Sequence, residues 1–325
     1  MARQALIPKT YPFSDPSTRT FSLAVAAGGS AWMSGCTAVR LDAASGRMVV
    51  EGDLVAQARI ALEKTRIVLE AGGFGLHDIV AMTHYLTPAA LADQPSLMAF
   101  YGEIFGGVLP VVSTIVVKRL LRGAALIEIE SVAGRDGAGA LEYLPPALGA
   151  DLPAARKHAG ALLASHGLEW PSVVRSTELL VPAAFADVGM QFGTPRARLQ
   201  VGMPRVTTED AGAQIQMSAT RTGGMQVRVF TAEGDPRVGG VDAQCREIYA
   251  RIGRQMEAAG CSLDDVVKTT EFVTPAGLPD YRLTADVRRE VFSAPYPAAT
   301  GVVCERLVDP GAQLSVDAIA VLRVS

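Results

Sequence analysis

The sequence predicts an α/β (α+β) fold in which three β-β-α-β-α-β-β repeats, the middle one abridged, close into a single-chain pseudo-trimer. The first observation is an internal repeat, because residues 57–110 and 244–297 align without a gap. The alignment continues into the last strand, where Ala133 falls on Ala320. This period is longer than the roughly 20–45 residues of stacking repeats, so each copy should be a small domain.

The second observation is a weaker copy between the first two. In this copy Pro182 falls on Pro88, and residues 213–219 fall on residues 127–133. The middle copy has lost residues near its second helix, and its opening hairpin is missing or remodelled. The repeats are expected at three ranges: residues 1–135, 145–221 (abridged) and 222–325.

The first half of repeat 1 is predicted to be a hairpin followed by a helix. Residues 21–26 and 31–39 are typical of two short strands separated by glycines. Asp53 can cap the helix that follows, and Gly72 with Gly73 can end it. Apolar residues recur along one face of this helix at helical spacing: Leu54, Ala58, Ala61, Leu62 and Leu69.

The second half of repeat 1 is predicted to be a strand over residues 77–86, a helix over 95–105 and closing strands over 113–118 and 125–133. Both closing strands are rich in β-branched and aliphatic residues. A sheet that is apolar on both faces must bury both, and three copies around one axis can do so. Only residues 134–152 are typical of a linker, which favours a ring over three separate domains.

Composition excludes several classes of function. The 325 residues carry a net charge of -3 with both signs interspersed, so neither nucleic acid nor a membrane is expected as a partner. The start of the chain lacks an apolar signal, and no stretch is long enough to span a bilayer, which predicts a cytoplasmic protein. The cysteines lack metal-ligand spacing, so we expect thiols without a metal or cofactor: Cys36, Cys245, Cys261 and Cys304.

Several motifs carry a resemblance to a known family. They are Ser34-Gly35-Cys36 after the hairpin and the segments at residues 76–80, 110–114 and 128–130. In these motifs the chain resembles the Rid/YjgF family of imine and enamine deaminases. Members of that family are homotrimers with ligand clefts between subunits. The resemblance therefore implies a trimer fused into one chain, with clefts between the repeats.

The resemblance also points to an arginine that holds a substrate carboxylate. The family's hydrolases place it in the first closing strand, where its planar fork can donate two parallel hydrogen bonds. Repeat 1 has Val112 at this position and repeat 3 has Ala299. Repeat 2 keeps Arg196 and Arg198, which are two apart and so face the same side of a strand. One working cleft lined by these arginines is our hypothesis, and a pair of solvated arginines on an edge strand is the alternative.

A glutamate on the last strand helps the family's deaminases to position or deprotonate the attacking water. Repeat 1 has Glu128 there, whereas repeat 2 has Gln214 and repeat 3 has Ser315. No single repeat therefore holds both the arginine and the glutamate. By the same resemblance the residues that line the substrate are Phe21, Ser34 and Cys36. For Cys36 the alternative is a buried, inert thiol.

One position departs from the family in all three repeats, where His84, Glu178 and Glu271 are equivalent. If these side chains converge near the axis, they would form a polar or metal cluster. If they lie in separate clefts, each is a candidate catalytic acid or base. The third interpretation is that the two glutamates pair with nearby arginine or lysine.

The predicted function is hydrolytic deamination of a small imine or enamine carboxylate in a cleft between repeats. Water, an anchor and one base suffice for this reaction, so no cofactor is expected. The expected partner is a small anionic metabolite, and further self-association of the ring is left open. One alternative is a lyase or hydrolase of a cyclic carboxylate, because chorismate-cleaving enzymes are similar in fusing Rid-like domains. The other is a non-catalytic protein that binds a small metabolite.

Overall fold

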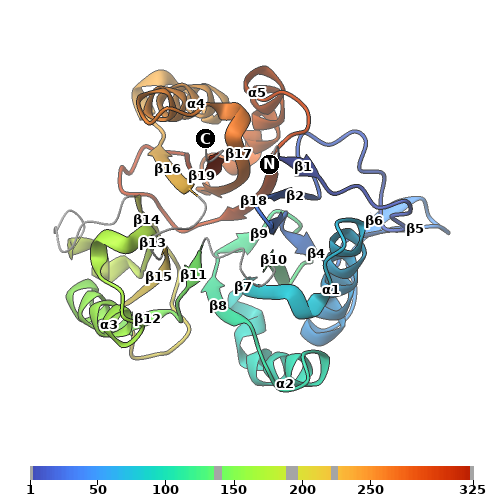
Figure 1. Ribbon diagram of the computed structural model, residues 1–325, viewed down its shortest axis with the longest axis horizontal. Helices are drawn as coiled ribbons and strands as arrows, with labels where there is room; N and C mark the ends of the chain where they lie inside the picture. Colours follow the sequence, from blue (N-terminus) through green and yellow to red (C-terminus); the bar gives the residue numbers. More distant parts are fainter. Residues whose placement is uncertain (1–2, 135–140, 188–196, 221–225, 323–325) are drawn as a thin grey trace.

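The protein has three lobes around a common centre, with the sheets inside and the helices outside (Figure 1). The computed structural model describes residues 3–134, 141–187, 197–220 and 226–322. Each lobe contains one sheet, and the names repeat 1, repeat 2 and repeat 3 denote the parts of the chain that build these sheets in order. The predicted fold class is therefore confirmed.

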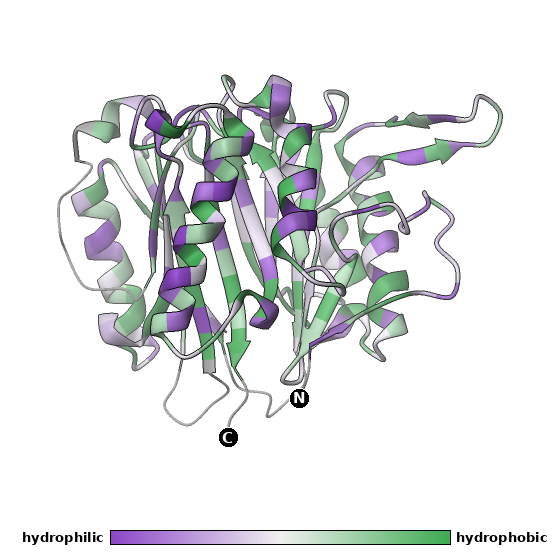
Figure 2. Cartoon of the chain, turned by 90° about the horizontal axis from the view of Figure 1, so that it is seen from above, coloured by the Kyte–Doolittle hydropathy of each residue, from purple (hydrophilic) through white to green (hydrophobic). Residues whose placement is uncertain are grey.

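Repeat 1 contains a seven-stranded sheet and two helices. Its strands are β1 (Gln4–Ala5), β2 (Ala24–Ala27), β3 (Ser30–Met33), β4 (Cys36–Thr37), β7 (Ile79–Leu86), β8 (Val111–Val116) and β10 (Ile127–Gly134). The order is β1-β2-β3-β10-β7-β8, with β4 beside β10. The helices are α1 (Leu54–Ala71) and α2 (Gln94–Ile104). A separate hairpin of β5 (Arg40–Asp42) and β6 (Arg47–Val49) projects from the ring (Figure 2).

Repeat 2 contains a smaller sheet and one α-helix within its described residues. Its elements are β11 (Glu142–Tyr143), β12 (Ala147–Gly149), α3 (Leu152–Ser165), β13 (Val173–Leu180), β14 (Arg198–Gly202) and β15 (Ala213–Ala219). Both β11 and β12 pair with β15, on the side where β3 and β4 pair with β10 in repeat 1. Residues 134–152 are therefore not a simple linker as predicted. Within that range β11 and β12 form hydrogen bonds with the backbone of β15 at the edge of the sheet.

Repeat 3 closes the ring. Its elements are β16 (Gln226–Glu233), α4 (Val241–Ala258), β17 (Val266–Val273), α5 (Thr284–Val291), β18 (Ala298–Val303) and β19 (Leu314–Leu322). Its sheet has the order β16-β19-β17-β18-β9. The last strand of that order, β9 (Arg119–Leu120), comes from repeat 1. A strand of repeat 1 therefore extends the sheet of repeat 3.

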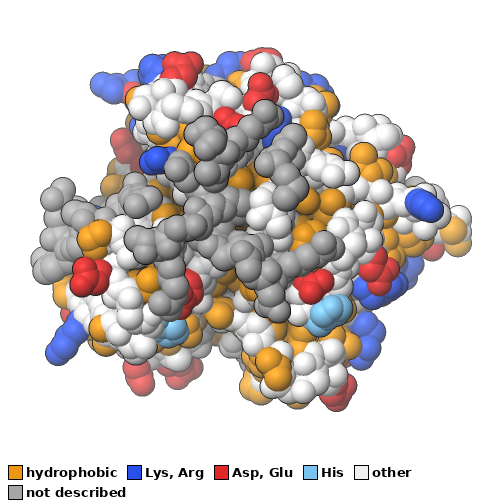
Figure 3. Space-filling view, viewed as in Figure 1, with side chains coloured by type: hydrophobic (Ala, Val, Ile, Leu, Met, Phe, Trp, Pro, Cys, Tyr) orange, Lys and Arg blue, Asp and Glu red, His pale blue; other side chains and the backbone are white. Residues whose placement is uncertain are grey.

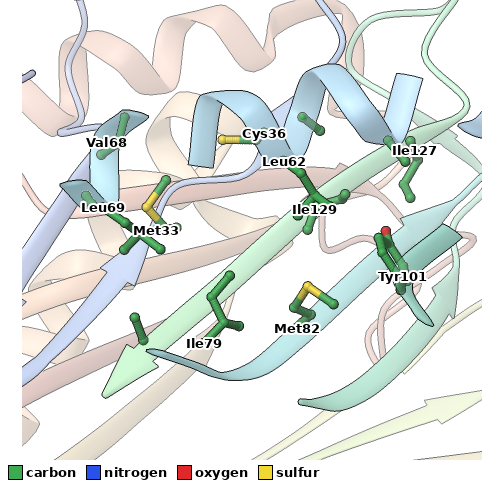
Figure 4. Close-up of a cluster of buried hydrophobic side chains, with 14 of the residues drawn as sticks. Met33, Cys36, Leu62, Val68, Leu69, Ile79, Met82, Tyr101, Ile127 and Ile129 are labelled. Carbon is green, nitrogen blue, oxygen red and sulfur yellow. The ribbon is translucent and has the colours of Figure 1, made fainter. Parts of the chain in front are cut away.

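Local sequence explains the first helix and the strand beside it. The Asp53 carboxylate accepts a hydrogen bond from the Ala56 N–H at 2.8 Å, so Asp53 caps α1 as predicted. On β10, Ile127 and Ile129 belong to the apolar cluster beneath the helices (Figure 4). Because side chains alternate along a strand, Glu128 lies on the opposite face.

The inner faces of the three sheets are buried against one another. Tyr85, Leu179 and Phe272 occupy equivalent strand positions and belong to one apolar cluster at the centre. Each is at most 1% exposed. Full burial of such a side chain stabilises a fold by about 1.5–3 kcal/mol, so the centre holds the lobes together.

The surface matches the nearly neutral composition. On the face drawn in Figure 3, acidic and basic side chains are scattered around the rim without gathering in one patch. Among the described residues no helix is long and apolar enough to cross a membrane. All four cysteines are buried and unpaired with one another.

Candidate functional site

The candidate site is a cavity of about 310 Å³ in repeat 1. It opens where the link between β3 and β4, helix α1, strand β10 and the loop after β9 meet. Apolar side chains form part of its wall, and three cationic side chains and one carboxyl group also line it. The polar lining residues are Tyr11, Arg19, Ser34, Cys36, Thr37, Lys64, Arg122 and Glu128. Of the predicted site residues, Phe21, Ser34, Cys36 and Glu128 meet here.

Glu128 is the distinctive group of this cavity. Its side chain is buried, and within the described part of the chain no hydrogen bond reaches its carboxyl oxygens. Burial raises the pKa of this carboxyl to about 8, although Lys268 and Lys64 act in the opposite direction. The carboxyl group lies against Gly35, where an added Cβ would come within 1.9 Å of Oε1. Glycine at position 35 is therefore required for this placement of Glu128.

Three cations surround Glu128 in the cavity wall. The Lys64 ammonium donates to the Thr37 carbonyl at 2.8 Å and to the Val39 carbonyl, and burial lowers its pKa to about 8. The Arg19 guanidinium lies 5.3 Å from the centre of the Phe21 ring. Arg122 is exposed at the rim. These cations can attract an anionic ligand toward the carboxyl group.

Ser34 and Gly35 connect this site to repeat 3. The Ser34 hydroxyl donates to the Ser22 carbonyl at 2.6 Å and accepts from the Ala299 N–H at 2.8 Å. The Gly35 N–H donates to the Ala299 carbonyl at 3.2 Å. Because a hydroxyl has one proton to donate, Ser34 holds the contact between repeats here instead of donating to the cavity.

Cys36 and Phe21 line the cavity, and neither supplies a side chain that is activated as a nucleophile, acid or base. Burial raises the pKa of the Cys36 thiol, and its sulfur donates weakly to the Ser34 carbonyl at 3.6 Å. This environment fits the interpretation of Cys36 as a buried, inert thiol. Phe21 contributes an aromatic wall beneath Arg19.

The predicted arginines lie elsewhere. Strand register puts Arg198 beside Ser176, just as Val112 lies beside Met82 and Ala299 beside Thr269. Arg198 therefore occupies the anchor position, whereas Arg196 falls outside the described residues. The prediction left open whether Glu128 reaches the cleft that holds the arginine. In this structure it does not, because Arg198 lines a different cavity of about 350 Å³ between repeats 2 and 3.

Arg198 also makes contacts that the prediction did not include. Its Nε donates to Glu178 Oε2 at 3.0 Å, and its side chain is 24% exposed. The Arg156 guanidinium bonds the same carboxylate, 2.9 Å from Glu178 Oε1. Glu178 thus occupies the arginine fork that a substrate carboxylate would need. The interpretation of Arg198 as a solvated arginine is wrong for this reason.

The three equivalent polar residues do not converge at the axis. His84 packs against Tyr101 of α2, with ring centres 5.0 Å apart. Glu271 accepts hydrogen bonds from Arg288 at 2.9 Å and from Tyr281 at 2.6 Å. Like Glu178, each lies under the helices of its own repeat. The pairing interpretation therefore fits both glutamates, and the axial cluster is wrong because this face of each strand points outward.

His84 differs from the two glutamates because neither ring nitrogen has a hydrogen-bond partner among the described residues. Burial lowers its pKa to about 3, which keeps the ring neutral. Within the described chain, no group of His, Cys, Asp or Glu side chains is arranged to hold a metal ion. None of the three residues reaches the cavity around Glu128.

Among the cavity residues that the sequence prediction missed, four have titratable side chains: Tyr11, Arg19, Lys64 and Arg122. One of them carried a signal. Lys64 follows Ala61 by three residues and precedes Val68 by four, so it falls on the buried stripe of α1. A lysine on such a stripe indicates a buried polar contact. The other three lie in loops, where no periodicity indicates which way a side chain points.

The comparisons with known proteins agree with this fold. A family model described as endoribonuclease L-PSP matches residues 14–134 and 225–322. A RutC family protein of Pyrococcus horikoshii is 33% identical over 116 residues, which are 36% of this chain and 87% of that protein. The 2-iminobutanoate/2-iminopropanoate deaminase of Bos taurus is 31% identical over 96 residues, or 30% of this chain and 68% of the deaminase.

The chain is also similar to proteins with solved structures. The Rid family protein YyfA of Yersinia pestis is 28% identical, covers 41% of this chain and 100% of its own, and has a TM-score of 0.35. The YjgF gene product of E. coli is 27% identical, covers 41% of this chain and 98% of its own, and has a TM-score of 0.34. Because the family model spans more than half of the sequence, the chain belongs to the endoribonuclease L-PSP family, the Rid/YjgF proteins.

Proposed function

We propose that this protein hydrolyses the imine or enamine form of a small carboxylic acid in the cavity around Glu128. The observation that carries the proposal is the carboxyl group of Glu128, which is 7% exposed, lines a cavity with three cations and has no protein hydrogen bond among the described residues. Buried polar groups are normally hydrogen-bonded, so an unbonded carboxyl facing a cavity indicates a partner that is not protein. A water molecule or a polar substrate would supply that partner.

The residues suggest a division of roles. Arg19 and Arg122 can hold the substrate carboxylate. They would thereby take the role of the anchoring arginine, whose position in repeat 3 is occupied by Ala299. Glu128 in its ionised form can take a proton from water as the water oxygen bonds to the electrophilic imine carbon. Transfer of that proton to nitrogen, with return of the hydroxyl proton to Glu128, lets the C–N bond break and the carbonyl form. The products are ammonia and a carbonyl acid, and the step needs no oxidant or reductant.

Two further facts support this assignment. A carboxyl group with a pKa of about 8 is well matched to proton transfer near neutral pH. In addition, one relative is named as a deaminase of 2-iminobutanoate and 2-iminopropanoate. The small anionic metabolite expected from the sequence is thus a 2-imino acid or its enamine.

The test is to generate an imine in place and follow its disappearance. An amino acid oxidase with catalase makes 2-iminopropanoate from alanine, and semicarbazide traps what remains. We expect the wild-type protein to lower the trapped fraction and Glu128→Gln to lose this effect by about 10²–10⁴-fold. Ser315→Ala, which changes the equivalent position in repeat 3, should keep it. If the imine decays at the buffer rate with wild-type protein, the proposed function is wrong.

A further inference from the structure

Two strand positions face each other across every contact between repeats. Ala81, Arg175 and Lys268 are equivalent by register, because each pairs with the same position of the last strand in its sheet. Glu130, Gln216 and Asp317 are equivalent in the same way. A cation from one repeat can therefore meet an anion from the next. The contact between repeats 3 and 1 is called the 3–1 junction below, and the 2–3 and 1–2 junctions are named likewise.

Two of the three junctions hold such an ion pair. Lys268 Nζ lies 2.9 Å from Glu130 Oε2 across the 3–1 junction, and their side chains are 1% and 8% exposed. The same ammonium also donates to the Thr300 hydroxyl. Across the 2–3 junction, Arg175 Nε donates to Asp317 Oδ2 at 2.8 Å. Three of these four side chains are buried and Arg175 is 17% exposed, so solvent screens the pairs little.

The pair at the 3–1 junction lies next to the candidate site. Glu130 and Glu128 are two residues apart on β10 and so extend from the same face of the strand. Lys268 thus brings a cation from repeat 3 beside the carboxyl of repeat 1 that lines the cavity. The same lysine compensates the charge of Glu130, which would otherwise oppose ionisation of Glu128.

We propose that Lys268 is a positioning residue for the reaction, supplied by repeat 3 to keep Glu128 of repeat 1 able to ionise. This proposal rests on the function proposed above. It implies that the cavity in repeat 1 is incomplete without the 3–1 junction, even though no side chain from the described part of repeat 3 lines it. Lys268 acts through Glu128 and Glu130 and does not contact the substrate.

The charges facing Glu128 come from several elements. Burial is the largest influence and favours the neutral acid, as does Glu130 on the same strand. Lys268 on β17 and Lys64 on α1 favour the carboxylate. The other titratable or charged groups that face it are Cys36 on β4, Tyr85 on β7, and Arg19 and Arg122 in loops. Lys268 is the cation with the largest influence on Glu128.

The test measures the ionisation of Glu128 directly. In full-length protein with carboxyl-labelled glutamate, the NMR signal that disappears in Glu128→Gln is followed from pH 5 to 10. Lys268→Met should raise the titration midpoint by about one pH unit or more, because the nearby cation is lost. Glu130→Gln should lower the midpoint, since a like charge is lost. Lys118→Met breaks the exposed Lys118–Glu305 ion pair of the same 3–1 junction and should leave the midpoint unchanged.

A second readout separates this inference from the proposed function. The activity of wild-type protein toward 2-iminopropanoate should rise with pH along the titration of Glu128, and each variant should shift that profile with its NMR midpoint. If the midpoints shift but no protein shows turnover, the inference about Lys268 stands and the function fails. If turnover is present and the midpoint stays in place in Lys268→Met, the inference is overturned. Should Lys268→Met fail to fold, a midpoint unchanged in Glu130→Gln overturns it equally.

Discussion

The 3–1 and 1–2 junctions bring equivalent surfaces together, yet they are held in different ways. At the 3–1 junction, β9 of repeat 1 pairs with β18, and Lys268 forms a buried ion pair with Glu130. At the 1–2 junction the equivalent residues are Ala81 and Gln216, which line a cavity of about 50 Å³. The side-chain contact described there is Gln214 Nε2 donating to the Thr114 carbonyl at 2.8 Å.

This difference shows what fusion of the repeats permits. A homotrimer must place the same residues at all three of its interfaces, so one substitution changes every interface at once. In a single chain each junction can change alone. Here the junction with the ion pair adjoins the cavity of Glu128, and the junction without it has glutamine, Gln214, at the position of that glutamate. The cavity of Glu128 and the buried ion pair therefore occur at the same junction.

The largest expected effect is a difference in the free energy of unfolding between variants of the 3–1 and 1–2 junctions. Lys268→Ala leaves Glu130 buried without its cation, which should lower the free energy of unfolding by about 3–5 kcal/mol. Gln214→Ala removes one hydrogen bond and should cost about 1 kcal/mol. Urea unfolding followed by circular dichroism measures both. Equal losses would show that the two junctions are equally strong and would remove the contrast.

The second prediction compares the two candidate anchors. Arg19→Ala should lower kcat/KM for 2-iminopropanoate by about 10–100-fold, because a charge-assisted hydrogen bond contributes about 1.5–3 kcal/mol. Arg198→Ala should leave kcat/KM within about twofold, since Glu178 already occupies its fork. Steady-state kinetics on both variants and the wild-type protein decides this. A large loss in Arg198→Ala alone would move the site to the cavity between repeats 2 and 3.

The third prediction concerns the dependence of stability on pH. The pKa of Glu128 is raised to about 8 in the folded protein, so the folded state holds its proton where the unfolded state has released it. Glu128 therefore lowers stability progressively as the pH rises from about 5 to 8. Glu128→Gln cannot ionise and should gain stability over the wild-type protein across this window. Unfolding curves at pH 5 and pH 8 check this, and a difference that is constant with pH would contradict it.

The smallest effect concerns a position that also differs between repeats. His84 is buried with both ring nitrogens unpartnered among the described residues, whereas Glu271 in repeat 3 bonds Arg288 and Tyr281. His84→Phe should keep or raise stability by up to about 1 kcal/mol, because an unsatisfied polar group is removed. Glu271→Phe is the matched control and should destabilise the protein. A clear loss of stability in His84→Phe would reveal a partner of this histidine.

Sequence patterns predicted the features that depend on local order. The internal repeat predicts one large sheet in each of three repeats, Asp53 is identified as a helix cap, and alternation along β10 separates Glu128 from Ile127 and Ile129. The site itself was predicted only in part. Ser34 and Cys36 do lie near Glu128, because the short segment from β3 to β4 that carries both runs beside β10.

The remaining features depend on contacts between residues far apart in the chain. Glu178 lies 22 residues from Arg156 and 20 from Arg198, and no spacing rule predicts that one carboxylate bonds both. The same holds for β9, a two-residue strand that pairs with another repeat. Its sequence cannot indicate that partner, because the partner edge forms only once the ring has closed.

The central claim is that the working site is the cavity around Glu128 and not the cavity beside Arg198. The most direct measurement is a crystal structure of the protein with pyruvate, the stable acid that hydrolysis of 2-iminopropanoate produces. The account predicts pyruvate between Arg19 and Glu128, with its carboxylate toward the arginine. Pyruvate bound only against Arg198, with the cavity around Glu128 lacking it, would contradict the account.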